Sequence, residues 1–379
     1  MSLGYKKNII KQVFIHETMN WGGAEVLRKT YASYANKSDN LGVTFEILII
    51  CLRSKGVLGE VLDNMDGVQV IALNWQGKLP AWGLVWQLCR KLRAIKPDVV
   101  HTCLFEANRH GVIASRLAGI QKVMIEEHGD NCWMGWRERW LSRMLVWLSS
   151  QVLTVSQAHA KHIIDYMPYP RDKVTVLRNC VDIQRLLLSE EKEDEVSQGC
   201  FLLNIGSLRK IKNMPVLLQA HAMVLKRVPD CHLSIVGDGE LKSELVELTH
   251  ALDMSEQVSF LGLREDIGSL LNQADIYVHA GSAESFCIAM AEALCSSRAC
   301  VAPDNAVFRE LTHDGKVAML VEPNSPEAMA DAIVYLINHK AERKALGEAA
   351  GKYALEHFLP EQYILSLLGI YKAIGVLRA

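Results

Sequence analysis

The segment His279-Ala-Gly-Ser-Ala-Glu284-Ser-Phe-Cys-Ile-Ala-Met-Ala-Glu292-Ala293 joins an apolar run to a stretch with helical periodicity. The run that leads into it, 275–280, is rich in β-branched and aromatic residues and predicts a buried strand. A loop of small residues follows, and the apolar spacing after it predicts a helix that begins near Ser285 or Phe286. A strand, a short loop and a helix form the repeating unit of α/β proteins. The segment therefore predicts an α/β fold with a parallel sheet.

The same alternation of strand and helix patterns occupies both halves of the chain. The strand segments are almost continuously apolar, which indicates sheets that helices cover on both faces. The predicted strands are 11–16, 44–51, 98–103, 122–127, 151–156 and 174–178, and then 201–206, 231–237, 257–261, 275–280, 299–302 and 317–321. We therefore expect two Rossmann-like, doubly wound domains in tandem that face a cleft.

A charged and polar stretch without apolar periodicity, 188–200, separates the two sets and predicts a solvated linker. It divides an N-terminal domain, 1–187, from a C-terminal domain, 201–359. The last segment, 360–379, reads as a helix with no strand after it. A chain of 379 residues is about twice the common size of one domain, which agrees with two separate cores.

The composition excludes several classes of protein. Lys and Arg number 41 against 43 Asp and Glu, so a net charge of -2 provides no overall attraction to nucleic acid. The best candidate for a membrane-spanning helix, 144–156, is shorter than the roughly 18 residues required and contains polar residues. The first residues lack the apolar core of a secretory signal. We expect a cytoplasmic protein that is not integral to a membrane.

Two carboxylates in the opening segment predict a ligand site. Free backbone N–H groups in the first turn of a helix, together with the positive end of its dipole, favour a diphosphate. Glu284 lies at the mouth of that site, where it can accept hydrogen bonds from sugar hydroxyls. Glu292 lies about two turns deeper on an otherwise apolar helix face, where a carboxylate is costly unless paired. Taken singly, Glu284 reads as a helix cap and Glu292 as a core acid, but together they favour a ligand site.

The spacing of these acids resembles the Glu-x7-Glu element of the family 4 (group 1) retaining glycosyltransferases. Their fold is the GT-B type, in which a C-terminal helix crosses back to the N-terminal domain. The resemblance covers nearly the whole chain. It implies that Glu284 binds hydroxyls of the donor sugar and that Glu292 binds the ribose of the nucleotide. Ser285 and Cys287 replace two glycines of the family pattern.

Further donor-binding residues follow from the same resemblance. It implies that the backbone amides of Phe286, Cys287 and Ile288 bind the donor phosphates. The loop Val236-Gly237-Asp238-Gly239 also matches the family and could line the nucleotide pocket.

A second matching segment is Leu203-Asn-Ile-Gly206-Ser-Leu-Arg-Lys-Ile-Lys212-Asn213. Lys212 matches a lysine that holds the donor diphosphate in the family, and we expect it to be catalytic. Ser207 stands where the family has an arginine. Arg209 or Lys210 could reach the same oxygens, because long side chains can adopt many positions and arginine can bind a phosphate with two hydrogen bonds. For both residues a basic turn in solvent is the simpler interpretation.

The N-terminal half carries three further matches. Gly22-Gly23-Ala-Glu25 follows the first predicted strand and resembles a Gly-Gly-x-Glu loop that reaches the donor phosphates and the acceptor. A Gly-Gly pair by itself more often marks a turn. His101 and His128 each end a predicted strand, where α/β clefts collect ligands. The resemblance implies that His128 lies against the transferred sugar and that His101 and Glu25 lie on the acceptor side.

The resemblance also implies the reaction. A hexose-type sugar would pass, with retention at the anomeric carbon, from a UDP-sugar or a GDP-sugar to a glycan or lipid-linked acceptor of cell-surface polysaccharide or lipopolysaccharide synthesis. The chain has no Asp-x-Asp triplet, which argues against the metal-dependent single-domain transferases. Lys212 and helix amides would neutralise the leaving diphosphate, so we expect no metal and no cofactor. A degenerate non-catalytic partner subunit, and a phosphorylase or epimerase of the same fold, remain alternatives.

Aromatic and basic residues interleave in two segments, 82–93 and 133–147. Trp136, Trp140, Met144 and Trp147 share one face of a predicted helix. We interpret this face as core. The alternative is an interfacial face that binds a lipid surface and makes the protein peripheral on the inner face of the membrane.

Overall fold

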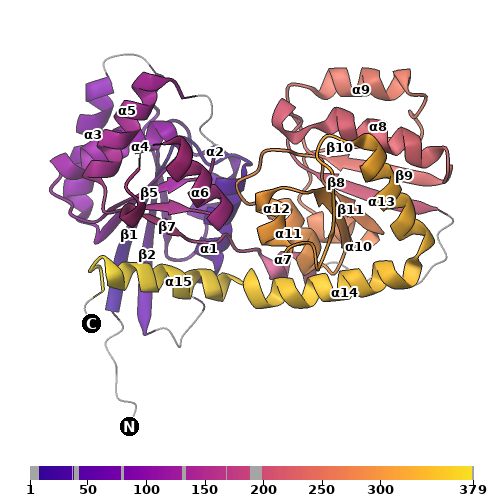
Figure 1. The fold of residues 1–379 in the computed structure, drawn as a ribbon. Helices are drawn as coiled ribbons and strands as arrows, with labels where there is room; N and C mark the ends of the chain where they lie inside the picture. Colours follow the sequence, from indigo (N-terminus) through magenta and orange to yellow (C-terminus); the bar gives the residue numbers. More distant parts are fainter. Residues whose placement is uncertain are drawn as a thin grey trace, which may run out of the picture. The chain divides into compact units, whose positions relative to one another are not determined.

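The computed structural model describes residues 8–35, 37, 42–77, 81–129, 134–167, 169–187 and 199–377. The chain forms two compact units (Figure 1). The N-terminal unit is Met1–Cys180 together with Pro360–Ala379, and the C-terminal unit is Val181–Leu359. Most of the predicted linker, 188–198, lies outside the described residues.

The N-terminal unit is built on a seven-stranded sheet of order β3-β2-β1-β4-β5-β6-β7 in which every pair is parallel. Its strands are β1 (Asn8–His16), β2 (Val43–Cys51), β3 (Val68–Ala72), β4 (Val99–Cys103), β5 (Val123–Glu127), β6 (Gln151–Thr154) and β7 (Val174–Val176). All six predicted strands are present. The prediction missed β3, although four of its five residues are apolar; the strand is short, lies at the sheet edge and contains one buried residue.

The C-terminal unit is built on a six-stranded parallel sheet of order β10-β9-β8-β11-β12-β13. Its strands are β8 (Cys200–Ile205), β9 (Cys231–Val236), β10 (Val258–Gly262), β11 (Ile276–Val278), β12 (Ala299–Pro303) and β13 (Met319–Val321). Each lies within two residues of a predicted strand at its start, and this sheet confirms the second predicted set.

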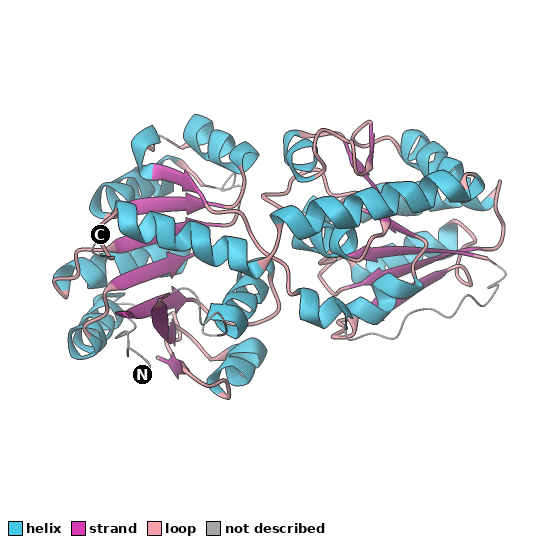
Figure 2. Ribbon diagram, turned by 90° about the horizontal axis from the view of Figure 1, so that it is seen from below, coloured by secondary structure: helices cyan, strands magenta, loops and turns pink. Residues whose placement is uncertain are grey.

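Helices cover both faces of each sheet (Figure 2). The N-terminal unit contains α1 (Gly23–Ala35), α2 (Gly56–Asp63), α3 (Ala81–Ile95), α4 (Phe105–Leu117), α5 (Trp136–Leu148), α6 (Gln157–Tyr166), the 3-10 turn η2 (Arg171–Lys173) and α15 (Pro360–Ala373). The C-terminal unit contains α7 (Ile183–Leu187), the 3-10 turn η3 (Lys210–Lys212), α8 (Met214–Leu225), α9 (Lys242–Ala251), α10 (Ile267–Gln273), α11 (Ile288–Cys295), α12 (Ala306–Leu311), α13 (Pro326–Asn338) and α14 (Lys340–His357). Each unit has its own apolar core, so the two-domain α/β prediction is confirmed.

The boundary between the units differs from the predicted end of the first domain at residue 187. Helix α7 belongs to the C-terminal unit, where it packs against α10 and α11. The guanidinium of Arg185 donates hydrogen bonds of 2.9 and 3.2 Å to the carbonyl oxygen of Glu265. The last helix, α15, belongs to the N-terminal unit and packs on α1, as predicted for a C-terminal helix that crosses back.

Both sheets reverse their strand order at one point. In the N-terminal unit this point lies between β1 and β4, and in the C-terminal unit it lies between β8 and β11. Loops at the carboxyl ends of such strands diverge and leave a crevice that binds ligands in α/β proteins. The predicted site residues follow these strands: Gly22 and Gly23 follow β1, Lys212 follows β8 and Glu284 follows β11.

Candidate functional site

Glu284 and Lys212 form an ion pair in the C-terminal unit. The Lys212 ammonium donates a hydrogen bond to Oε1 of Glu284, and Nε2 of His279 lies 2.9 Å from the same oxygen. The exposed fraction of the side chain is 8% for Glu284 and 20% for Lys212. Because β8 and β11 are neighbours in the sheet, these two residues meet although 72 positions separate them in sequence.

This cluster sets the charge of its members. Burial raises the pKa of Glu284, but the hydrogen bond from His279 and the charge of Lys212 outweigh it and hold the pKa at about 2. Burial lowers the pKa of His279, but Cys287 and Glu284 outweigh it and raise the pKa to about 9. At neutral pH a carboxylate, which only accepts hydrogen bonds, therefore lies between two cations.

The loop between Glu284 and α11 differs from the prediction. The helix begins at Ile288, and the predicted start near Ser285 or Phe286 is wrong. Cys287 precedes the helix with a φ of 70°, a left-handed conformation that favours glycine and cannot continue a helical turn. The first-turn amides therefore begin at Ile288, whereas Phe286 and Cys287 lie in the loop before it. Phe286 is buried and packs edge-on against Phe358, with the ring centroids 5.7 Å apart.

Glu292 lies inside α11 and is 7% exposed. Nη1 of Arg185 lies 3.9 Å from its Oε1. Burial raises the pKa of Glu292 to about 7, although the charge of Arg185 opposes this. The sequence did not identify Arg185 as the partner. A buried acid requires a cationic partner, and this requirement is the signal that such a partner exists. The periodicity of the sequence does not identify which distant cation it is.

Two loops at the ends of β8 and β9 are held together by backbone hydrogen bonds. Gly206 N–H donates to Val236 at 2.9 Å, and Leu208 N–H donates to Asp238 at 3.0 Å. Gly237 has a φ of 135°, and a β-carbon there would collide with the carbonyl oxygen of Gly206. The glycine is therefore required for the close approach that places Ser207 beside this loop.

The basic residues next to Lys212 are more exposed than Lys212 itself. Arg209 and Lys210 are both exposed. The charge of Arg209 acts on the pKa of Lys212, in the opposite sense to Glu284 and more weakly. Arg209 therefore lies within electrostatic reach of Lys212.

In the N-terminal unit, Glu126 is the centre of a buried polar cluster. Its carboxylate accepts a hydrogen bond of 2.5 Å from Nη2 of Arg28 and lies 2.7 Å from Nδ1 of His101 and 3.3 Å from Nε2 of His128. Burial opposes ionisation, but the charge of Arg28 and the two histidines hold the pKa of Glu126 well below its usual range. Neither Glu126 nor Arg28 was identified from the sequence.

The two predicted histidines have different environments. His101 lies within β4 rather than at its end and is 1% exposed. Its Nε2 lies 2.7 Å from the hydroxyl of Tyr371 in α15, so both ring nitrogens are engaged inside the unit. His128 follows β5, keeps 10% of its side chain exposed and lines a cavity with Thr154, Asn179 and Tyr363.

Glu25 and the adjacent glycines lie at the start of α1. The carbonyl oxygen of Gly22 accepts a hydrogen bond of 2.9 Å from the N–H of Val26 in the first helical turn. A β-carbon at Gly22 would collide with the carboxylate of Glu25. Burial raises the pKa of Glu25 and the charge of His128 lowers it, so these two predicted residues lie within electrostatic reach of each other. Gly23 is exposed and begins the helix.

Two groups of side chains among the described residues have donor atoms within 4.8 Å of one another: Cys103, Glu126 and His128, and His279, Glu284 and Cys287. Each group contains a carboxylate that already pairs with a cationic side chain, Arg28 in the first and Lys212 in the second. A metal ion would have to compete with these cations at close range. The charges fit an anionic ligand near Lys212 better than they fit a cation.

Comparisons with known families cover both units. A model for glycosyltransferase family 4 matches residues 21–185, and a model for glycosyl transferases group 1 matches residues 189–353. The crystal structure of HepE from Anabaena, in complex with UDP and glucose, superposes with a TM-score of 0.84 at 20% identity and covers 95% of this chain and 99% of that chain. The similarity to HepE shows the fold.

Curated relatives match the chain over part of their length. N-acetyl-alpha-D-glucosaminyl L-malate synthase of Bacillus anthracis is 25% identical over 207 residues, which are 53% of this chain and 54% of that protein. The chain thus spans about half the length of this relative. The N-acetylgalactosamine-N,N'-diacetylbacillosaminyl-diphospho-undecaprenol 4-alpha-N-acetylgalactosaminyltransferase of Campylobacter jejuni is 25% identical over 277 residues, which are 71% of this chain and 74% of that protein. With one family model over each unit and a shared two-sheet fold, the chain belongs to the family 4 (group 1) glycosyltransferases.

Proposed function

We propose that this protein transfers a hexose-type sugar from a nucleotide sugar to a glycan or lipid-linked acceptor in cell-surface polysaccharide or lipopolysaccharide synthesis. The observation that carries the proposal is the Lys212, Glu284 and His279 cluster at the reversal point of the C-terminal sheet. UDP and glucose in the HepE crystal support a UDP-sugar, and a GDP-sugar is the second choice. The diphospho-undecaprenol in the name of the Campylobacter relative supports a lipid-linked acceptor.

The donor would be held by charge and by hydrogen bonds. Lys212 has three N–H donors, of which one bonds to Glu284 and the others can bind the diphosphate. Both contacts to Glu284 engage Oε1, and we assign Oε2 to hydroxyls of the donor sugar. Arg209 adds positive charge, Ile288 and its neighbours add helix amides, and Glu292 binds the ribose. This arrangement neutralises the leaving group without a metal ion or a cofactor.

The chemical step that we propose is retaining. The acceptor hydroxyl attacks the anomeric carbon from the side of the leaving group as the bond to the diphosphate breaks. The hydroxyl proton passes to a departing phosphate oxygen, so no protein nucleophile is required. The work of the protein is positioning and charge stabilisation. In the N-terminal unit we assign His128 to the transferred sugar and Glu25 to the acceptor, while the buried His101 acts through Glu126.

A non-catalytic partner subunit is the competing function, and the replacement of family residues by Ser207 and Cys287 favours it. The ion pair of Lys212 with Glu284 is nevertheless intact. Slow hydrolysis of a nucleotide sugar by the purified protein would exclude the partner subunit. Release of a sugar phosphate on addition of inorganic phosphate would instead indicate a phosphorylase, and a change in the configuration of the free nucleotide sugar would indicate an epimerase.

Thermal unfolding in the presence of UDP-, GDP- and ADP-sugars tests the proposal directly. A ligand that binds only the native state stabilises it by about 2.7 kcal/mol at a hundredfold excess over Kd. We expect the melting temperature to rise with the concentration of a UDP-sugar or a GDP-sugar. No rise with any of the three would contradict a nucleotide-sugar site.

The pKa of Glu292 predicts a pH dependence of donor binding. A carboxylate that accepts hydrogen bonds from ribose hydroxyls must be ionised, and the pKa of Glu292 is about 7. The affinity for the nucleotide sugar should therefore fall about tenfold between pH 8 and pH 6, as the carboxyl group takes up a proton. Calorimetry with the intact nucleotide sugar is suitable, because its diphosphate does not titrate in this range. The variant Glu292→Gln should bind more weakly at pH 8 and lose the pH dependence, and an unchanged slope in that variant would refute the assignment.

We place the reaction in the cytoplasm, at the inner face of a membrane. Within the described parts of the chain, no helix is both long enough and apolar enough to cross a bilayer. A lipid-linked acceptor would nevertheless be found at a membrane surface, so a peripheral contact would bring the enzyme to it.

A further inference from the structure

Five tryptophans of the N-terminal unit lie on its surface. Their exposed fractions are 71% for Trp82, 59% for Trp86, 76% for Trp136, 66% for Trp140 and 74% for Trp147. The interpretation of the face that carries Trp136, Trp140 and Trp147 as core is therefore wrong. Large aromatic side chains are usually buried in proteins, and several exposed on one region mark a binding surface.

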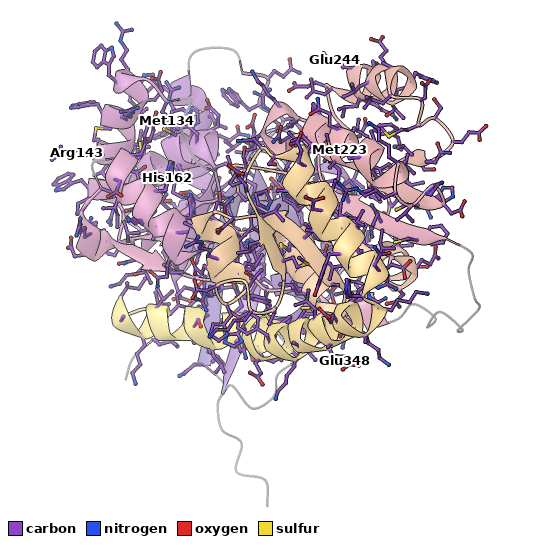
Figure 3. All side chains as sticks on the ribbon, turned by 45° about the vertical axis from the view of Figure 1, so that its right-hand side comes forward. Met134, Arg143, His162, Met223, Glu244 and Glu348 are labelled. Atoms are coloured by element: carbon purple, nitrogen blue, oxygen red, sulfur yellow. The ribbon has the colours of Figure 1, made fainter. Side chains whose placement is uncertain are left out.

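The tryptophans belong to two helices on the same side of the sheet. Helices α3 and α5 both pack against α4 (Figure 1). The outward stripe of α3 consists of Trp82, Trp86, Arg90 and Arg93, and that of α5 consists of Trp136, Trp140, Arg143 and Trp147. Figure 3 shows Arg143 at the outer edge of this unit. We call these two stripes the tryptophan face.

The opposite stripes of the same helices already supply the core. Leu84, Val85 and Leu88 of α3 and Leu145 and Val146 of α5 are at most 4% exposed. Each helix is thus apolar on its inner side and aromatic on its outer side, so packing within the unit does not account for the tryptophans. A helix that is apolar on both sides has a second apolar environment to contact.

The charge of these helices identifies that environment. Helix α3 carries Arg90, Lys91 and Arg93 and no acidic residue. Helix α5 carries Arg137, Arg139 and Arg143 and one acidic residue, Glu138. Basic side chains are thus concentrated here, although the whole chain has a net charge of -2. A surface that complements them is anionic.

A second copy of this chain does not fit this face. A twofold symmetric contact would place the same stripes against each other, so that arginines faced arginines without acidic partners. A lipid surface avoids this repulsion, because indole rings bind at the level of the headgroups and basic side chains bind lipid phosphates.

We propose that the tryptophan face docks the N-terminal unit on an anionic bilayer, with the indole rings among the headgroups and the arginines on lipid phosphates. The inference rests on the proposed function for the location at a membrane, and it adds the surface and the class of lipid.

Co-sedimentation with vesicles tests this docking on the full chain. Wild-type protein should bind vesicles of phosphatidylcholine with phosphatidylglycerol at least tenfold more tightly than vesicles of phosphatidylcholine alone. The double variant Trp136→Ala/Trp140→Ala should lose at least tenfold in affinity, and Arg143→Gln about fivefold, since each basic residue near an anionic surface has an effect of this size. Leu263→Ala, at a 62% exposed apolar residue of the C-terminal unit, is the matched control and should bind as the wild type does.

Quenching of tryptophan fluorescence by brominated phospholipids provides a second readout. Bound wild-type protein should be quenched, and the double variant should be quenched less. Absence of binding to anionic vesicles would overturn the docking, and so would a dimer in solution that the double variant dissociates. Hydrolysis of the nucleotide sugar without vesicles should be unchanged in the double variant. Hydrolysis of the donor without binding to vesicles would refute only the docking. Binding to vesicles without any activity on the donor would refute only the transferase function.

Discussion

Replacement of Lys212 by alanine is expected to reduce kcat for glycosyl transfer about 10²- to 10³-fold. Negative charge grows on the diphosphate as the bond to the sugar breaks, and Lys212 is the half-buried cation in η3, after β8, that would stabilise it. The loss of this charge also leaves Glu284 with His279 as its remaining cationic contact, so the pKa of Glu284 should rise. Initial rates of transfer, or of donor hydrolysis when the acceptor is unknown, measure the effect.

The control for this variant is Lys210→Ala. Lys210 is exposed and lies two positions away in the same 3-10 turn, so the substitution tests for a general loss of positive charge. It should change kcat by less than about twofold, since exposed charges act weakly. Near-normal activity of Lys212→Ala, with an unfolding temperature close to that of the wild type, would rule out a catalytic role for the lysine.

Glu284→Gln is expected to reduce transfer about 10²-fold while the fold is kept. The amide has nearly the shape of the carboxylate, but it has no charge and offers a single acceptor oxygen. Lys212 and His279 both contact that oxygen in the native protein, so in the variant two cations would repel each other across a neutral group. The hydroxyls of the donor sugar would also lose the carboxylate oxygen that accepts their hydrogen bonds.

Two measurements isolate this effect. Glu348→Gln, at an exposed glutamate of α14 (Figure 3), removes an equal charge from the same unit and should leave activity unchanged. The pKa of His279, which Glu284 helps to raise to about 9, should fall in Glu284→Gln and can be followed by NMR of the ring protons. Wild-type turnover in Glu284→Gln would remove this residue from the donor site.

The fold was largely predictable because parallel strands buried on both faces leave a strong apolar signal. Twelve strands followed from runs of β-branched residues, and the missed strand, β3, has little buried surface. The domain boundary was less predictable. Helix α7 is short, and what assigns it to the C-terminal unit is its packing on α10 and α11, which no local pattern records.

The site was predictable where one loop carries it and less so where strands bring distant residues together. Glu284 and Glu292 were identified from their spacing along one segment. Arg185 as the partner of Glu292 and Glu126 as the partner of His101 and His128 were not, because each pairing depends on which elements are adjacent in space.

The sequence by itself determined the two-domain α/β architecture, the positions of Glu284 and Lys212 after their strands, and the periodic spacing of the tryptophans. These features depend on local order along the chain, which periodicity and turn chemistry report. Only the tertiary structure decided that Glu284 contacts Lys212 and His279, that His101 is buried, and that the tryptophans face outward. Helical spacing defines a face but not what covers it, and contact between distant residues is settled by sheet order and packing, which exist only in the folded chain.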